Sequence, residues 1–300
     1  MMTKFSVLIT CYNKEQMIFD AIMSAKNQVG VHEVLVVDDC SSDGSINQIR
    51  KHHGITVLSN AHNLGVSAST EIGIRHAHQR GADYIVLLDG DDILAPNAVQ
   101  YYRSVLEKTG SDAIYSKVLR GTSDCRPLAV PCDPASNITI INDPFDFYLK
   151  RIRATTAVCA RPLLMVETFN PTLRVQDHQI AFSIFKNAQK VVISDAITHY
   201  CSEGRGNTNL SADHLAVATS CVRMYAETYY LTRNSKFHYS YVDRSLRRAL
   251  RIRHTNAMPW KYNLFLQIVT PFKKLLPTPI QHKIMMGIFL RLPIHPASIA

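Results

Sequence analysis

The feature that most constrains the fold is a repeated pattern in which a short, almost entirely apolar segment is followed by a helical pattern. The apolar segments occupy residues 5–10, 32–39, 55–60 and 83–89. Apolar segments that alternate with helices across short loops are typical of parallel strands that are covered by helices on both faces. We therefore predict an α/β fold, in which a mostly parallel central sheet forms the middle layer of an α/β/α sandwich.

The helical patterns between these segments vary more in length. After the first strand we expect a helix of about four turns, with Asn13 as its N-cap and Gln16 completing a capping box. Further helices are expected within 45–52, 65–81, 95–110, 145–151, 179–188 and 214–231, a strand over 112–119, and a strand or hairpin over 190–204.

Polar residues follow three of the predicted strands directly. Thr10–Tyr12, Asp38–Asp39 and Asp89–Asp91 all stand at the carboxyl ends of their strands. Ligands of open α/β sheets bind beyond the carboxyl ends of the strands. The three polar groups are therefore expected to meet in one crevice.

The segment LDGDD, residues 88–92, allows two interpretations. An Asp-Gly pair after a strand is typical of a hairpin turn, but a helical pattern follows here instead of a return strand. Three carboxylates at the end of a buried strand repel one another and require a compensating cation. Asp-x-Asp at the edge of an α/β crevice can hold a divalent metal, with water and phosphate oxygens as the other ligands. We therefore favour metal binding.

Four segments stand in order along the chain: SVLITCYNKEQMIFDAIMSAKNQ, EVLVVDDCSSDGS, NLGVSAS and LLDGDDILAPNAV. They resemble the motifs of the family 2 glycosyltransferases, which have the GT-A fold, and the resemblance extends over about residues 4–210. It implies inverting transfer of a sugar from a nucleoside-diphosphate sugar, with a UDP-sugar as the expected donor. The acceptor would be a glycan or a lipid-linked molecule, and the role would be bacterial surface polysaccharide assembly, as in lipopolysaccharide or capsule.

The resemblance also implies roles for residues of the first half. Thr10, Tyr12 and Asp39 would contact the nucleotide base, and Asn63 would shape the loop near the nucleotide. Alternatively, Tyr12 packs on the sheet edge, and Asp39, like Asp38, caps a turn.

For the acidic segment, the resemblance implies that Asp89 faces the ribose or diphosphate and shares the metal with Asp91. Asp91 would bind Mn²⁺ or Mg²⁺ on the diphosphate. Asp92 is expected to support the start of the next helix, and Asp43 to be a turn residue.

In the second half, Asp177 matches the family's general base, although Gln176 stands where glutamate is usual. An aspartate at a helix N-terminus is stabilised as the anion, and a carboxylate can accept a proton from a sugar hydroxyl. The alternative is that Asp177 is only an N-cap. His178 is expected to support the site or contact the acceptor, and a purely structural role is the alternative.

One further segment departs from the family pattern, and another contains candidate residues whose role has an alternative. Thr70-Glu71 replaces the usual Arg-Asn, so a cation facing the phosphate or base is missing. In THYCSEGRGNTN, residues 198–209, His199 and Arg205 are candidates to close over the diphosphate, and a surface loop is the alternative.

The net charge of +9 is concentrated in one region. Ten of the 33 basic residues lie within 244–300, which contains no acidic residue, so residues 1–243 hold 23 basic against 24 acidic side chains. This argues against a nucleic-acid groove in the body. The extension alternates basic clusters with apolar pieces, none long enough to span a bilayer. It is predicted to be helical and to bind the membrane surface, and a packing layer or a contact between subunits of a homo-oligomer is the alternative.

These observations define the predicted organisation. Residues 1–110 would be the half that binds the nucleotide sugar, 111–243 the acceptor half of the same domain, and 244–300 the extension. Without a signal peptide, and with scattered cysteines, the protein is expected in the cytoplasm at the inner membrane. A dehydrogenase and a sugar nucleotidyltransferase are disfavoured because no glycine-rich loop follows the first strand. A non-catalytic, membrane-bound nucleotide-sugar-binding scaffold stays open.

Overall fold

The computed structural model describes residues 3–122, 130–150, 157–167, 169–173 and 175–203, together with Ser220 and Met224. The chain divides into two compact units, and the first, which comprises 1–148, 152–172 and 176–208, contains the sheet. The predictions for Arg205 and for the extension at 244–300 lie outside the described residues, as does the predicted helix at 214–231 except for Ser220 and Met224, which are helical.

The described strands form one mixed sheet. Its order is β3 (Thr56–Ser59), β2 (Val31–Asp38), β1 (Phe5–Cys11), β4 (Tyr84–Asp89), β8 (Val158–Ala160), β6 (Ala113–Thr122), β9 (Val191–Glu203) and β5 (Asp92–Leu94), and β7 (Ile138–Ile141) pairs with β9. The four strands from β3 to β4 are parallel, as are β6 and β9. By contrast, β5, β7 and β8 run antiparallel to their neighbours. The predicted parallel arrangement is thus the first half of a mixed sheet.

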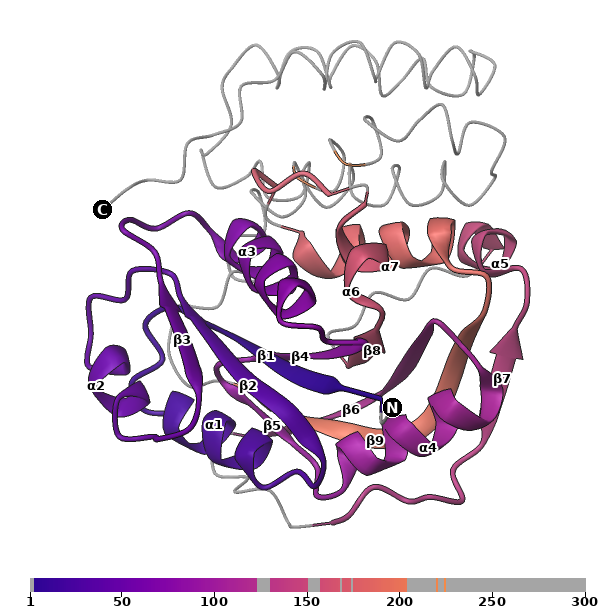
Figure 1. The fold of residues 1–300 in the computed structure, drawn as a ribbon, viewed down its shortest axis with the longest axis horizontal. Coiled ribbons are helices and arrows are strands. Elements are labelled where there is room, and N and C mark those ends of the chain that lie inside the picture. Colours follow the sequence, from indigo (N-terminus) through magenta and orange to yellow (C-terminus); the bar gives the residue numbers. More distant parts are fainter. Residues whose placement is uncertain are drawn as a thin grey trace, which may run out of the picture. The chain divides into compact units, whose positions relative to one another are not determined.

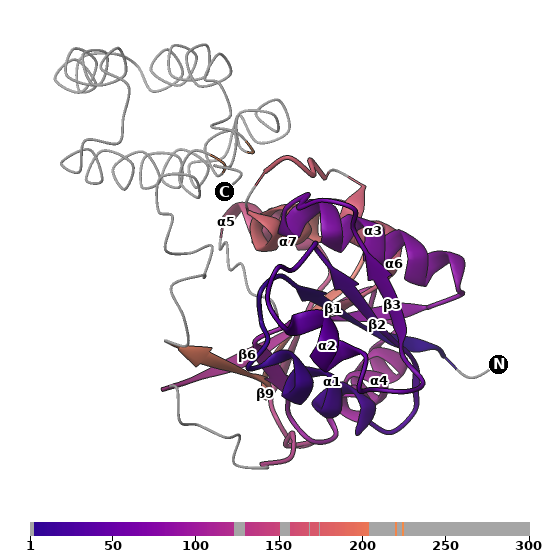
Figure 2. The same ribbon diagram turned by 90° about the vertical axis from the view of Figure 1, so that its left-hand side faces the viewer.

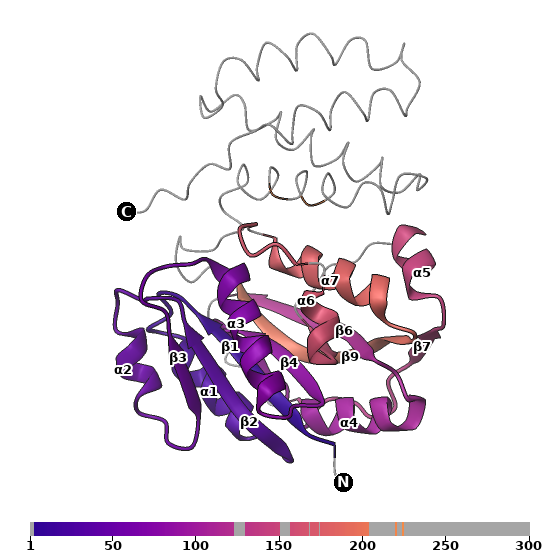
Figure 3. The same cartoon turned by 45° about the horizontal axis from the view of Figure 1, so that its top comes forward.

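Helices cover both faces of the sheet, which confirms the predicted sandwich (Figures 1 and 3). One layer contains α1 (Ile18–Lys26), α2 (Ser45–Ile49) and α4 (Ala98–Thr109). The other contains α3 (Val66–Gln79), α5 (Pro144–Lys150), α6 (Pro162–Val166) and α7 (Gln176–Asn187). Figure 2 shows that the ends of β6 and β9 project beyond the helical layers.

Alternating residues of the strands face the two layers. Val7 and Ile9 of β1 are fully buried in the same core as Ile22 of α1 and Tyr102 of α4. On the other face, α3 approaches closely at Gly73, because a Cβ at this position would lie 2.4 Å from a methyl carbon of Leu8. Any larger residue there would push the helix away from β1.

The predicted capping box at the first helix is wrong. Asn13 has a left-handed φ of 53°, and its Oδ1 accepts a hydrogen bond from the Ser42 backbone N–H at 2.8 Å. Turns that use the Lys14 carbonyl lead into α1, which begins at Ile18 and has nine residues, shorter than predicted. The side chain of Asn13 therefore ties two loops together instead of starting the helix.

The segment after LDGDD also differs from its prediction. Asp92–Leu94 forms the short strand β5 before α4 begins, so Asp92 does not support the helix start. This strand pairs with β9 and not with β4, so LDGDD does not form a hairpin turn. The residues of the segment thus connect two distant positions in the sheet.

Candidate active site

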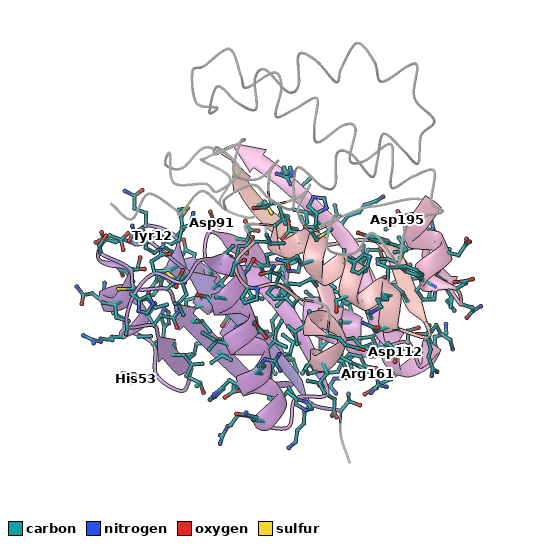
Figure 4. The ribbon with its side chains drawn as sticks, turned by 90° about the horizontal axis from the view of Figure 1, so that it is seen from above. Tyr12, His53, Asp91, Asp112, Arg161 and Asp195 are labelled. Atoms are coloured by element: carbon teal, nitrogen blue, oxygen red, sulfur yellow. The ribbon has the colours of Figure 1, made fainter. Side chains whose placement is uncertain are left out.

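The carboxyl ends of β1, β2 and β4 meet at one edge of the sheet, as predicted. In the strand register Thr10 lies beside Asp89, and Cys11 lies beside Asp38. The Gly90 N–H donates to the Thr10 carbonyl at 2.9 Å, and a Cβ on Gly90 would lie 2.8 Å from the same oxygen. Glycine thus allows the chain to turn tightly after Asp89. Figure 4 shows Tyr12 and Asp91 at this edge.

Asp39 organises the loop between β3 and α3. Its Oδ1 accepts hydrogen bonds from Asn60 Nδ2 and from the Leu64 N–H, and its Oδ2 accepts one from the Gly65 N–H, all at 2.8 Å. Gly65 has a φ of +89°, which glycine adopts without strain, and α3 starts at the next residue. Asp39 therefore shapes the loop that carries the exposed Asn63. Its contact with a nucleotide base stays a prediction.

The neighbouring acidic residues have local roles. Asp38 accepts hydrogen bonds from the N–H and the hydroxyl of Ser41, which confirms the turn interpretation. Asp43 accepts from Ser45 and from the Glu15 N–H, and these bonds lower its pKa, as expected of a turn residue. In contrast, Tyr12 is 39% exposed, so its ring can offer a flat surface at the edge.

Asp89 lies in a cluster of carboxylates from both halves of the domain. Burial raises its pKa well above the usual range, and the charges of Asp92, Asp177 and Asp91 raise it further, while Lys14 opposes the shift. Burial also raises the pKa of Asp92 to about 7, although a hydrogen bond from Cys201 Sγ at 2.8 Å opposes this shift. The predicted base and the predicted metal ligands thus act on one another electrostatically in a single site.

Asp177 lies in the first turn of α7, where the helix N-terminus favours its anion. Burial nevertheless raises its pKa to about 6, and the charge of Arg120 opposes this shift. The adjacent Gln176 is only 6% exposed. A glutamate at that position would add another buried carboxylate to a site that already has a surplus, so the neutral glutamine suits this environment.

Two cations at this site were not predicted from the sequence. Lys14 Nζ lies 2.6 Å from Asp91 Oδ2 in an ion pair. In the register of β6, β9 and β5, Cys201 lies between Arg120 and Asp92. Lys14 could have been noticed because it directly follows Tyr12-Asn13, whereas the position of Arg120 depends on strand pairing that the sequence does not reveal.

Other candidates have structural roles. His199 is fully buried, and its Nε2 donates to the Leu87 carbonyl at 2.8 Å, so the candidate role of closing over a diphosphate is wrong. Burial lowers the pKa of His199 to about 4. It also lowers the pKa of His178 to about 4, and the role of His178 at the site stays a prediction. The hydroxyl of buried Thr70 donates to the Val66 carbonyl, while Glu71 pairs with Arg75.

The donor chemistry of the carboxylate cluster fits a divalent cation. Within the described residues, no group of three or more His, Cys, Asp and Glu side chains is arranged to hold a metal ion. Mg²⁺, however, is commonly bound through one or two carboxylates, with water and substrate phosphates as the other ligands. Burial and, after it, neighbouring carboxylates raise the pKa values of Asp89 and Asp92, and a bound cation would favour their ionised forms.

Comparisons with known proteins identify the family of the chain. Residues 6–159, more than half of the chain, match the family described as Glycosyl transferase family 2. Over 221 residues the chain is 22% identical to the poly(ribitol-phosphate) beta-N-acetylglucosaminyltransferase TarS of Staphylococcus aureus strain MW2. This match covers 70% of the chain but only 38% of that relative.

Two solved structures have the same fold. The crystal structure of S. aureus TarS 1-349 in complex with UDP-GlcNAc has a TM-score of 0.62 and 17% identity, and covers 96% of this chain and 81% of its own. A mannosyltransferase from Pyrobaculum calidifontis, in complex with GDP-Man and Mn²⁺, has a TM-score of 0.53 and 14% identity, with coverages of 95% and 86%. The chain belongs to glycosyl transferase family 2 and has the GT-A fold that its sequence motifs predicted.

Proposed function

We propose that the protein transfers a sugar from a UDP-sugar to a hydroxyl group of a glycan or lipid-linked acceptor, with inversion at the anomeric carbon. One observation carries this proposal: Asp177 lies close enough to Asp89 for its charge to raise the pKa of that carboxyl. The candidate base and a residue that is expected to bind the metal and the nucleotide sugar therefore share one site. The TarS structure in complex with UDP-GlcNAc supports a UDP-sugar donor, and the relative named as a poly(ribitol-phosphate) beta-N-acetylglucosaminyltransferase supports a polymeric acceptor. A role in surface polysaccharide assembly is part of the same proposal.

Asp177 is suited to act as the general base. With a pKa of about 6 it is ionised at neutral pH, yet it is more basic than an ordinary aspartate. It would accept the proton of the acceptor hydroxyl as that oxygen bonds to the anomeric carbon. The bond between the anomeric carbon and the diphosphate oxygen breaks in the same step, and the nucleoside diphosphate leaves with the bonding electrons. A single displacement of this kind inverts the configuration.

Asp91 and Asp89 would hold Mn²⁺ or Mg²⁺. When bound, the ion neutralises charge that develops on the departing diphosphate. The remaining residues position the donor: Tyr12 and Thr10 lie at the same edge, and Asp39 fixes the loop beside them. Positioning and charge stabilisation would together supply most of the acceleration.

The basic extension suggests where the enzyme acts. We place it at the cytoplasmic face of the inner membrane, held by residues 244–300, because ten basic residues in apolar surroundings suit an anionic lipid surface. In the described part of the chain, no helix is both long enough and apolar enough to cross a bilayer. Binding to vesicles of anionic lipid, lost when residues 244–300 are removed or at high salt, would support this placement.

The proposal is tested by measuring nucleoside diphosphate release from a panel of UDP- and GDP-sugars, with MnCl₂ or with EDTA. Slow hydrolysis of the true donor is expected with MnCl₂ and not with EDTA. The variant Asp177→Asn should retain UDP binding and lose transfer to acceptor by about 10²–10⁴-fold.

The matched control is Asp195→Asn, which removes a half-exposed carboxylate whose ion pair with Lys117 spans 2.7 Å. This variant should keep full activity. Donor binding without turnover, whatever acceptor is offered, would favour the non-catalytic scaffold and would sink the enzymatic proposal.

A further inference from the structure

Lys14 has a position that the proposed mechanism leaves unexplained. Its Nζ donates to Asp91 Oδ2 at 2.6 Å, and the two side chains are 12% and 17% exposed. Lysine is rarely buried to this degree unless it is paired. The lysine therefore stands at the carboxylate that we assign to the metal.

The backbone around Lys14 is held firmly by the neighbouring loop. The Lys14 N–H donates to Ser45 Oγ at 2.7 Å, and the Glu15 N–H donates to Asp43 Oδ2 at 3.1 Å. Glu15 in turn accepts a hydrogen bond from the Gly44 N–H. These bonds fix the base of the Lys14 side chain, while its flexible four-carbon stem allows the ammonium to turn from one acceptor to another.

A divalent cation at Asp91 would be repelled by the ammonium of Lys14. A divalent ion bound to Asp91 would lie within a few ångströms of the ammonium, and two positive charges at that separation repel strongly where water is scarce. The diphosphate of a nucleotide sugar provides an alternative partner, since lysine binds phosphate oxygens as a compact point charge. The same side chain could thus serve the site both before and after the donor arrives.

We infer that Lys14 is the counterion of Asp91 before ligands bind and moves to a diphosphate oxygen of the donor when a divalent cation binds Asp91. This inference rests on the proposed function of the site. Lys14 would then weaken metal binding in the absence of nucleotide and strengthen it in its presence, which couples the two ligands. A purely structural ion pair makes the opposite prediction for the metal, because its loss would disorder the site and weaken both ligands.

The test measures binding, not activity. Calorimetry with MnCl₂ alone, and then with UDP at saturating MnCl₂, is compared between the wild type and Lys14→Met. The variant should bind Mn²⁺ at least about fivefold more tightly and UDP about tenfold more weakly. Lys117→Met is the matched control, since it breaks the half-exposed pair with Asp195, and it should change neither affinity.

A second variant covers the case in which Lys14→Met is poorly folded. Lys14→Gln retains a donor to Asp91 without the charge, so it should shift both affinities in the same directions. If both affinities fall together, or if neither moves while the wild type binds UDP with Mn²⁺, the inference is wrong although the proposed function stands. If neither the wild type nor the two variants bind Mn²⁺, with or without UDP, the inference and the metal-dependent mechanism are both overturned.

Discussion

The two edges of the sheet use the same residue types in opposite ways (Figure 4). At the amino end of β6, Asp112 accepts hydrogen bonds from Arg161 Nε at 3.0 Å and from the Gln189 and Lys190 N–H groups at 2.9 and 3.2 Å. The guanidinium of Arg161 also lies 5.2 Å from the centre of the Tyr84 ring. Every oxygen of Asp112 thus has a donor.

At the carboxyl ends of the strands, by contrast, the nearby cations do not offset the carboxylates. Asp89, Asp92 and Asp177 all have raised pKa values, with burial as the largest cause. The charges of Lys14 and Arg120 oppose these shifts without cancelling them. A carboxylate whose donors match its charge is a structural element, whereas a group of buried and partly buried carboxylates is a cost that a substrate or ion can relieve. The comparison therefore separates stability from function among the aspartates of one sheet.

The sharpest test of this difference exchanges one aspartate at each edge. Asp91→Asn should reduce transfer by about 10³-fold, because a metal ligand contributes several kcal/mol of charge stabilisation to the leaving group. Asp112→Asn should leave turnover per folded molecule within about threefold and instead lower the free energy of unfolding by roughly 1–3 kcal/mol, since one donor loses its acceptor. Turnover and urea unfolding are measured on both variants. Equal losses of activity would remove the distinction between the edges.

The pH dependence of sugar transfer should follow the ionisation of Asp177, which lies at the carboxyl ends of the strands. Asp177 must be ionised to accept a proton, and its pKa is about 6. Transfer measured as kcat/KM should therefore be constant above about pH 7 and should fall roughly tenfold per pH unit below 6. Asp112→Asn should show the same profile. A profile that breaks near 4, the range of an ordinary aspartate, would mean that burial does not perturb the base.

The raised pKa of Asp92 should also make the free energy of unfolding depend on pH. The pKa of Asp92 rises from an ordinary value of 3.8 to about 7 in the folded protein, so the folded state disfavours the ionised carboxyl. The protein accordingly loses stability as the pH rises from about 4 to 7. Asp92→Asn removes this loss and should raise the free energy of unfolding by up to about 4 kcal/mol at pH 8, with little gain at pH 4. Urea unfolding at both pH values checks this; an unchanged or lower stability at pH 8 would contradict it.

Those parts of the fold that depend on local sequence could be predicted. Apolar segments predicted β1 to β4, and the polar residues at their ends predicted which side chains meet. The strands β5, β7 and β8 have three or four residues and pair with partners distant in sequence, so nothing local marks them.

The same distinction between local and long-range determinants applies to the residues of the site. Asp89 and Asp91 could be singled out because they adjoin a buried strand. Lys14 contacts Asp91 across 77 positions of sequence, and that contact depends on the tertiary fold. The capping box at Asn13 failed for a related reason, since a distant loop offers its side chain a better partner.

The smallest effect is expected from a substitution of Arg161, which is exposed at the amino ends of the strands. Arg161 is 51% exposed, so its ion pair with Asp112 is screened by water and contributes about 1 kcal/mol or less. Arg161→Gln should lower the free energy of unfolding by no more than that, and added salt should shrink the difference further. Activity should not change, because the residue lies at the edge opposite Asp91. Urea unfolding at low and high salt, with transfer assays beside it, measures both quantities. A large loss of transfer with little loss of stability would show that the amino edge also contributes to catalysis, and the division of the sheet into a structural and a functional edge would then fail.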